Sequence, residues 1–266
     1  MNDAPLGVFD SGIGGLTVAR ALFERLPHEA VLYFGDTARV PYGPKSPETV
    51  RRYSAEILAY LIGRGVKAVI VACNTSTAHA LDHLRSRASV PVVGVIEPGA
   101  RAAVAASRSG TIGVIGTVGT VASGAYERAI KGLRPDATVV SAACPLFVPL
   151  VEEGWFDHPA AELIARDYLE PLRRSGVDVV VLGCTHYPLL KPLLQRVLGA
   201  GVQLIDSAEE TAAQVVKELA ARDLAASARP RPEHVFAVSD DEPRFRRVGE
   251  RFLGEKLKQV SVVPLG

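Results

Sequence analysis

The sequence predicts an α/β fold, with two pseudo-symmetric three-layer domains, mainly parallel sheets and a functional cleft between the domains. Strand-like apolar runs alternate with helical patterns along almost the whole chain. Several strand runs are continuous stretches of Val and Ile, as in Val177 to Leu182. Such strands are buried on both faces, which is typical of parallel sheets covered by helices.

A short internal repeat indicates two related halves. Residues 7–11, GVFDS, resemble residues 113–117, GVIGT, and residues 73–75, CNT, resemble residues 184–186, CTH. The two pairs occur in the same order and at nearly the same offset. Ligands of parallel sheets bind beyond the carboxyl ends of the strands, so we expect the two halves to face each other across one site.

The repeat predicts the domain boundaries. The first domain is expected to comprise residues 1–96 and 207–266, because the segment after Asp206 has no counterpart in the repeat and returns to complete the first half. The second domain is expected to comprise residues 97–206. Asp10 and Cys73 then belong to the first domain, whereas Glu152, Cys184 and His186 belong to the second.

The elements of the first half have clear local signals. A strand at 6–9 runs into the glycine-rich turn of 10–15, and apolar residues at helical spacing follow as far as Pro27. Ser46-Pro47-Glu48 is a helix start, with Ser46 as N-cap and Pro47 in the first turn. The remaining strands of this half are expected at residues 30–34, 66–72 and 91–96, with a helix between the last two.

The second half follows the same alternation. Its strands are expected at residues 111–115, 138–142, 177–182 and 202–205, with helices between them and an irregular segment at 144–156. Ser207 and Glu210 form a capping-box pattern for a helix that reaches about Arg222. A turn at Arg229 to Pro232, a strand at 234–238, a helix at 241–253 and a strand at 260–263 complete the chain.

Composition excludes several classes of function. The 266 residues carry a formal net charge of +1, which leaves no basic excess for nucleic acid as the main partner. Apolar runs long enough to span a bilayer and a secretory leader are both absent from the sequence, so no membrane association is expected. Three widely spaced cysteines form no disulfide framework. We therefore expect reduced thiols in a cytoplasm.

Cys73 and Cys184 are the main candidates for chemistry. Each ends a buried strand and is followed by small polar residues. A free cysteine is often only a small buried hydrophobe, but a helix start places backbone N–H groups near the sulfur. We therefore expect a lowered pKa for Cys73, and Cys184 lies in a similar context. Two thiols on opposite walls of a cleft would suit inversion at a carbon, with one removing a proton and the other returning one.

Other ionisable residues are expected to lie close to these thiols in the predicted site. Asp10 either caps its turn or assists Cys73, and His186 either orders a turn or assists Cys184. Glu152 belongs to a Glu pair for which solvation is the ordinary interpretation. A zinc site built from Cys73, Cys184 and His186 has no local ligand pair at zinc spacing, so no metal is expected.

Five blocks of sequence resemble glutamate racemase, and they occur in the order of that family between Leu6 and Ser207. They are FDSGIGGLTV (9–18), FGDTARVPYG (34–43), VACNTSTA (71–78), CPLFVPLVEEG (144–154) and LGCTHYPLL (182–190). The resemblance implies interconversion of L- and D-glutamate without a cofactor, supplying D-glutamate for peptidoglycan in a bacterial cytoplasm. It also implies a homodimer.

The resemblance carries roles onto particular residues. Cys73 is expected to deprotonate D-glutamate with the help of Asp10, and Cys184 to deprotonate L-glutamate with the help of Glu152 and His186. The substrate-binding positions that it implies are Asp10, Ser11, Tyr42, Gly43, Asn74, Thr75, Thr117, Thr120, Thr185 and His186. Two alternatives stay open: a racemase of the same superfamily acting on aspartate or another small acid, and a non-catalytic sensor that binds a dicarboxylate.

Overall fold

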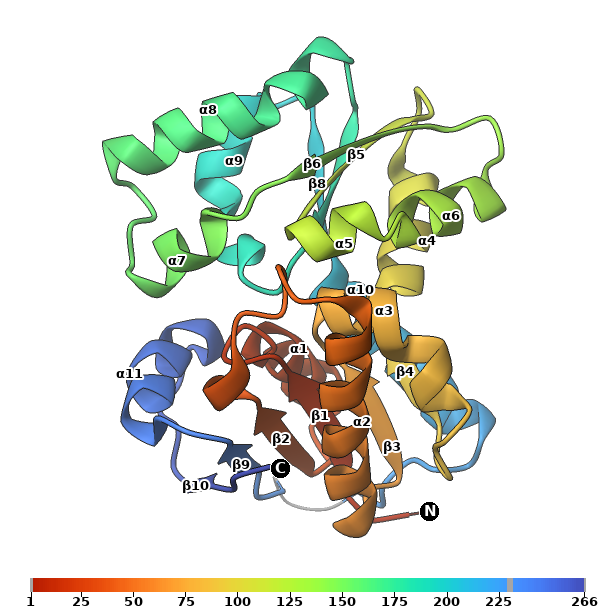
Figure 1. Ribbon diagram of the computed structural model, residues 1–266. Coiled ribbons are helices and arrows are strands. Elements are labelled where there is room, and N and C mark those ends of the chain that lie inside the picture. The colour runs from red at the N-terminus through yellow and green to blue at the C-terminus, as the bar shows by residue number, and fades with distance from the viewer. Residues whose placement is uncertain (1, 229–231, 266) are drawn as a thin grey trace.

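The computed structural model describes residues 2–228 and 232–265, and their strands form two parallel sheets in two lobes (Figure 1). Within these residues the first sheet has the strand order β10-β9-β2-β1-β3-β4, and the second has the order β6-β5-β7-β8. Strands β10 and β9 extend the first sheet on one side. The remaining four strands, β2-β1-β3-β4, have the same relative order as β6-β5-β7-β8 in the second sheet. The predicted pair of pseudo-symmetric α/β domains is confirmed.

The first domain has its sheet between two layers of helices. Its strands are β1 (Leu6–Asp10), β2 (Val31–Gly35), β3 (Ala68–Val71), β4 (Val92–Gly94), β9 (Val235–Val238) and β10 (Val260–Val262). Its helices are α1 (Leu16–Arg25), η1 (Thr37–Arg39), α2 (Pro47–Gly63), α3 (Asn74–Arg85), α10 (Ser207–Ala221) and α11 (Glu242–Leu253). Helices α2 and α3 cover one face of the sheet, whereas α1, α10 and α11 cover the other.

The second domain is smaller but has the same layers. Its strands are β5 (Thr111–Gly116), β6 (Thr138–Ala143), β7 (Val179–Gly183) and β8 (Gln203–Asp206). Its helices are α4 (Ile96–Ala106), α5 (Val118–Ala122), α6 (Ala125–Leu133), α7 (Phe147–Glu152), α8 (Pro159–Arg174), η2 (Tyr187–Leu190) and α9 (Lys191–Leu198). Helices α4 and α6 pack on one face, and α7, α8 and α9 lie on the other.

One apolar core joins the two domains. It contains Val8 and Ile70 from strands of the first sheet together with Phe147 and Leu182 from the second domain. The chain crosses from the first sheet to the second after β4 and returns after β8, and β9 then pairs in parallel with β2. The boundary residues 97 and 206 stay a prediction.

Local signals were right at some positions and wrong at others. The Ser46 hydroxyl accepts a hydrogen bond from the Thr49 N–H, which confirms the predicted N-cap of α2. The predicted capping box at Ser207 is wrong, because the carboxylate of Asp206 caps α10 by accepting from the Ala208 N–H at 2.9 Å. Helix α7 lies in the segment that was expected to be irregular.

Two further expectations concern the periphery of the fold. The turn predicted at Arg229 to Pro232 lies, apart from Pro232, outside the described residues. Among the helices of the described chain, none is long and apolar enough to cross a lipid bilayer.

Candidate active site

A cavity of about 390 Å³ lies between the two domains, beyond the carboxyl ends of the central strands. Its wall is formed by loop and helix residues of both domains. The predicted site residues that line it are Ser11, Tyr42, Gly43, Cys73, Asn74, Thr75, Thr117, Glu152, Cys184, Thr185 and His186. Segments far apart in the sequence therefore meet at one place.

The two other predicted residues, Asp10 and Thr120, lie directly behind this wall. The Asp10 carboxylate accepts hydrogen bonds from the Gly12 N–H at 2.9 Å and from the Thr185 hydroxyl at 3.5 Å. The Thr120 hydroxyl hydrogen-bonds with those of Thr75 and Thr117, at 3.3 and 3.0 Å. Both residues thus form hydrogen bonds with residues that line the cavity.

Cys73 is the N-cap of α3. Strand β3 ends at Val71, and the Ser76 N–H donates a hydrogen bond to the Cys73 sulfur over 3.4 Å. The Ser11 hydroxyl lies 3.7 Å from the same sulfur. The predicted position of the thiol, at the start of a helix, is confirmed.

The expectation of a lowered pKa for Cys73 is wrong. Burial and the nearby charge of Asp10 raise its pKa to about 11, against the opposing effect of the hydrogen bonds from Ser76 and Ser11. The free-energy cost of removing a thiolate from water is larger here than the stabilisation that the helix N-terminus provides. The resting form of Cys73 at neutral pH is therefore the thiol.

Cys184 has a different charge environment from Cys73. It follows β7, and the ring nitrogen Nδ1 of His186 lies 3.9 Å from its sulfur. The other nitrogen, Nε2, donates to the Glu152 carboxylate at 2.9 Å. Burial works to lower the pKa of His186, but its hydrogen bonds to Cys184 and Glu152 and their negative charges raise it to about 10. The Cys184 sulfur therefore has a charged imidazole beside it, whereas the Cys73 sulfur has a carboxylate nearby.

Glu152 is held from both domains. Burial opposes its ionised form, but the hydrogen bonds and charges of His186 and Arg244 lower its pKa. The Arg244 guanidinium, on α11 of the first domain, donates to its second oxygen at 3.0 Å. Sequence reasoning missed Arg244, because an exposed-type residue on an amphipathic helix carries no local signal of a partner 92 positions away.

Hydrogen bonds cross the cleft around the cavity. The Tyr126 hydroxyl donates to the Asn74 side-chain oxygen at 2.7 Å, and the hydroxyls of Thr75 and Thr117 share a bond of 2.9 Å. The domains are therefore closed on each other. Tyr126 was also missed, since an aromatic residue at a helical core position is indistinguishable from ordinary packing in the sequence.

Backbone groups also form hydrogen bonds across the cleft. The Gly119 N–H donates to the Gly43 carbonyl at 2.9 Å, and the ring of His79 hydrogen-bonds with the Gly119 carbonyl at 3.1 Å. Tyr42 is buried, and its hydroxyl donates to the Asp36 carboxylate, which fixes the loop that carries Gly43.

Among the described residues there is no group of three or more His, Cys, Asp or Glu side chains that could hold a metal ion.

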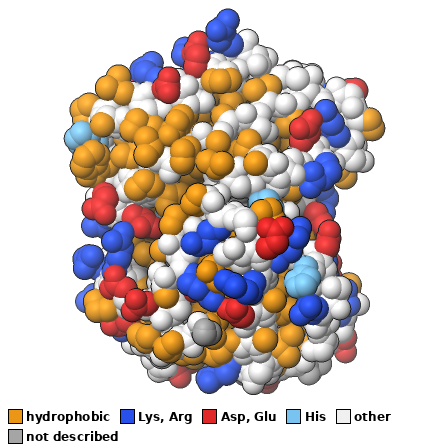
Figure 2. Space-filling view, in the orientation of Figure 1, with side chains coloured by type: hydrophobic (Ala, Val, Ile, Leu, Met, Phe, Trp, Pro, Cys, Tyr) orange, Lys and Arg blue, Asp and Glu red, His pale blue; other side chains and the backbone are white. Residues whose placement is uncertain are grey.

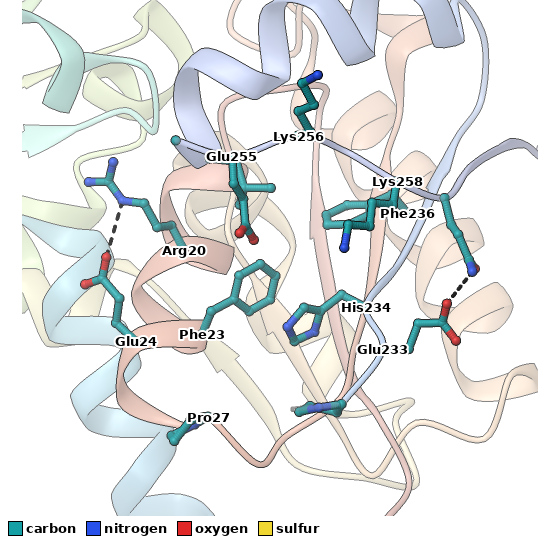
Figure 3. A pocket seen from close by; sticks show the side chains of 14 residues that line it. Arg20, Phe23, Glu24, Pro27, Glu233, His234, Phe236, Glu255, Lys256 and Lys258 are labelled. Carbon is teal, nitrogen blue, oxygen red and sulfur yellow. Dashed lines mark hydrogen bonds and ion pairs between the residues drawn. The ribbon is translucent and has the colours of Figure 1, made fainter. Parts of the chain in front are cut away.

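A second hollow, of about 650 Å³, lies between α1, β9 and the segment after α11 (Figure 3). Phe23 stacks on His234 in it, with ring centroids 3.7 Å apart. Its lining mixes three basic with three acidic side chains: Arg20, Lys256, Lys258, Glu24, Glu233 and Glu255. Neither thiol reaches this hollow, and its balanced charges select no class of ligand.

The fold and the site define a two-domain α/β protein with one thiol from each domain on the wall of a shared cavity. The family model of Asp/Glu/Hydantoin racemase matches residues 15–215. The chain therefore belongs to the Asp/Glu/Hydantoin racemase family and, by the relatives that follow, groups with the glutamate racemases.

A glutamate racemase from Geobacter metallireducens is 56% identical over 260 residues, which cover 98% of this chain and 96% of the relative. Among solved structures, a glutamate racemase isoform from Bacillus anthracis superposes with a TM-score of 0.96 at 41% identity, covering 100% of this chain and 99% of that one. A glutamate racemase from Francisella tularensis, in complex with D-glutamate, has a TM-score of 0.93 at 38% identity, covering 99% and 98%.

Proposed function

We propose that this protein interconverts L- and D-glutamate without a cofactor, by removing the α-proton on one face and returning a proton on the other. The observation that carries the proposal is the pair of buried cysteines, Cys73 and Cys184, which come from different domains and line one cavity. The identity with glutamate racemases across nearly the whole chain supports glutamate as the substrate.

The proton steps balance between the two thiols. In the L-to-D direction the Cys184 thiolate takes the α-proton, the bonding electrons stay on the carbon, and the Cys73 thiol gives its proton to the opposite face. Cys184 ends as a thiol and Cys73 as a thiolate, so the reverse reaction starts from this state. A raised pKa of Cys73 and a charged His186 beside Cys184 suit a resting enzyme that is ready for L-glutamate.

The assisting groups differ between the two halves. Asp10, whose pKa is raised by burial, lies behind Ser11 on the Cys73 side. His186 and Glu152 form a hydrogen-bonded pair on the Cys184 side. We assign to Asp10 the exchange of protons with Cys73, and to the His186–Glu152 pair the same role for Cys184.

Polar groups on the cavity wall are suited to bind the substrate and the carbanion. The small side chains that we assign to this role are Ser11, Asn74, Thr75, Thr117 and Thr185, together with the backbone of Tyr42 and Gly43. Donors fixed in advance stabilise developing charge most strongly where water is excluded. Thr120 acts through its bonds to Thr75 and Thr117.

We further propose that the product D-glutamate supplies peptidoglycan synthesis in a bacterial cytoplasm and that the protein forms a homodimer. Figure 2 shows hydrophobic side chains gathered over the second domain, with charges denser on the first. Leu146, Trp155 and Leu163 of the second domain are 47%, 44% and 69% exposed. Light scattering at several protein concentrations tests the dimer, and growth of a D-glutamate-requiring bacterium that carries this chain tests the supply role.

The proposed reaction is tested by isotope labelling and by single replacements. In deuterated water and metal-free, cofactor-free buffer, either enantiomer of glutamate should gain deuterium at the α-carbon during conversion. Cys73→Ser and Cys184→Ser should each nearly abolish racemisation, while Cys144→Ser, at the third buried cysteine, should retain it.

Each rival makes a different prediction in the same assays. Faster turnover of L-aspartate than of L-glutamate would assign the protein to another substrate. Binding of glutamate without exchange would indicate a sensor, and full activity of either serine variant at Cys73 or Cys184 would reject the two-thiol scheme.

A further inference from the structure

Helix α11 brings an arginine of the first domain to an acid of the second. The Nη2 atom of Arg244 lies 3.0 Å from Oε2 of Glu152, which is the last residue of α7. The other carboxylate oxygen, Oε1, accepts from His186 at 2.9 Å. The Glu152 carboxylate is thus held between one donor from each domain.

Two donors restrict this carboxylate more than one does. The terminal torsion of a Glu side chain is broad, so a single hydrogen bond leaves the plane of the carboxylate poorly defined. A charged guanidinium on the second oxygen fixes that plane and strengthens the contact. The side chain of Glu152 is 20% exposed and that of Arg244 is 43% exposed. Water therefore competes for the arginine more than for the acid.

We propose that Arg244 is a positioning residue for the Cys184 half of the reaction: it orients Glu152 toward His186 when the domains close. The order of contacts is Arg244 to Glu152, Glu152 to His186, and His186 to Cys184. The inference rests on the two-thiol function proposed above, and it links closure of the cleft to completion of one acid–base group.

On the Cys73 side, no Lys or Arg of the described residues forms a hydrogen bond or ion pair with Asp10, and the charge that reaches Asp10 across the domains is that of His186. There the Asp10 carboxylate accepts from the Gly12 N–H and the Thr185 hydroxyl. Loss of Arg244 should therefore slow proton transfer at Cys184 and leave proton transfer at Cys73 unchanged. Glu153, 3.8 Å from Arg244, is 65% exposed and is a weaker partner.

The test compares Arg244→Met with Arg247→Met as the matched control. Arg247 lies on the same helix, is exposed, and has no ion pair among the described residues. Arg244→Met should lower kcat/KM by about tenfold to a hundredfold, as expected for a misplaced acid–base group. Arg247→Met should stay near the parent activity.

The isotope effect on each direction separates positioning from a general structural loss. Enantiomers have equal free energies, so kcat/KM must fall equally in both directions. If the Cys184 step is slowed, the primary deuterium isotope effect on kcat/KM should rise with α-deuterated L-glutamate and fall toward one with α-deuterated D-glutamate. Arg244→Lys, which keeps the charge but not the fork, should lie between parent and methionine variant.

Several results would overturn the inference. Equal activity of Arg244→Met and Arg247→Met would do so, and so would isotope effects that change in the same sense in both directions. If the methionine variant fails to fold, Arg244→Lys carries the same isotope comparison. Loss of the inference leaves the two-thiol function intact, because that function fails only if the parent shows no α-carbon exchange or if a serine variant at Cys73 or Cys184 stays active.

Discussion

At the scale of single residues, the two cysteines occupy equivalent positions but differ in the charges around them. Cys73 has the carboxylate of Asp10 nearby, and its pKa is raised to about 11. Cys184 has His186, whose pKa is raised to about 10. The repeat therefore preserves the place of the thiol and not the charged groups around it.

The raised pKa of His186 makes a prediction about stability. A group whose pKa is raised by folding stabilises the native state fully below its unfolded pKa, near 6.5, and loses this contribution as pH rises through the folded value, about 10. The free energy of unfolding lost in His186→Asn should therefore be largest at pH 6 and shrink toward pH 10. Urea denaturation at pH 6, 8 and 10 measures it.

The control for this prediction is His83→Asn. His83 lies on α3, away from the cavity lining. Its effect on the free energy of unfolding should show no decline between pH 8 and 10. A loss in His186→Asn that is independent of pH would mean that His186 is not charged in the native protein.

At the scale of elements, the turn between β1 and α1 sets how closely the domains approach. A Cβ atom on Gly14 would lie 2.3 Å from Oγ1 of Thr185 and 2.4 Å from Nδ1 of His186. Both of those residues belong to the second domain. The glycine therefore serves contact between domains at the site, in addition to any role in the turn.

Replacement of Gly14 tests this close approach. Gly14→Ala should keep the fold, with about 1–3 kcal/mol lost to overpacking, and should lower kcat/KM by tenfold or more because His186 is displaced. Gly132→Ala, on α6 where nothing lies within 4 Å of the added atom, is the control and should keep full activity. Steady-state kinetics and thermal melting of both variants give the comparison. Equal kcat/KM values for the two variants would show that the structure accommodates the added methyl group without displacing His186.

Elements were predictable where a local pattern decides them. The alternation of strands and helices, the Ser46 cap and the strand-end position of Cys73 depend on neighbouring residues, and the structure confirms them. Helix α7 was not predicted, and its Pro149 lies in the first turn, where a proline costs no hydrogen bond within the helix.

Features that depend on tertiary contacts could not be predicted from local sequence patterns. The raised pKa of Cys73 arises from burial among both domains, and no local pattern measures burial against a helix N-terminus. The cross-domain partners Arg244 and Tyr126 lie 92 and 52 positions from the residues that they bind. The sequence did allow us to select Cys73, Cys184 and His186 as candidates, because the repeat and the motif blocks both contain them.

At the scale of the whole molecule, the continuous core predicts cooperative unfolding. Apolar residues from both sheets belong to the same buried cluster, beside a smaller cluster within each domain, so unfolding of one domain exposes apolar surface of the other. We expect one thermal transition in scanning calorimetry, with calorimetric and van't Hoff enthalpies in agreement. Two separated transitions would show that the domains unfold independently. A single transition that divides into two when glutamate is added would show the same.

The crossings between the domains also determine how the cleft opens. The chain crosses after β4 and after β8, where α4 and α10 begin, and these two helices pack together. Figure 1 shows them on one side of the molecule and α7 and α11 on the other. A rotation about the paired crossings would separate α7 from α11. The Arg244–Glu152 bond joins these two helices, so an opening of this kind must break it.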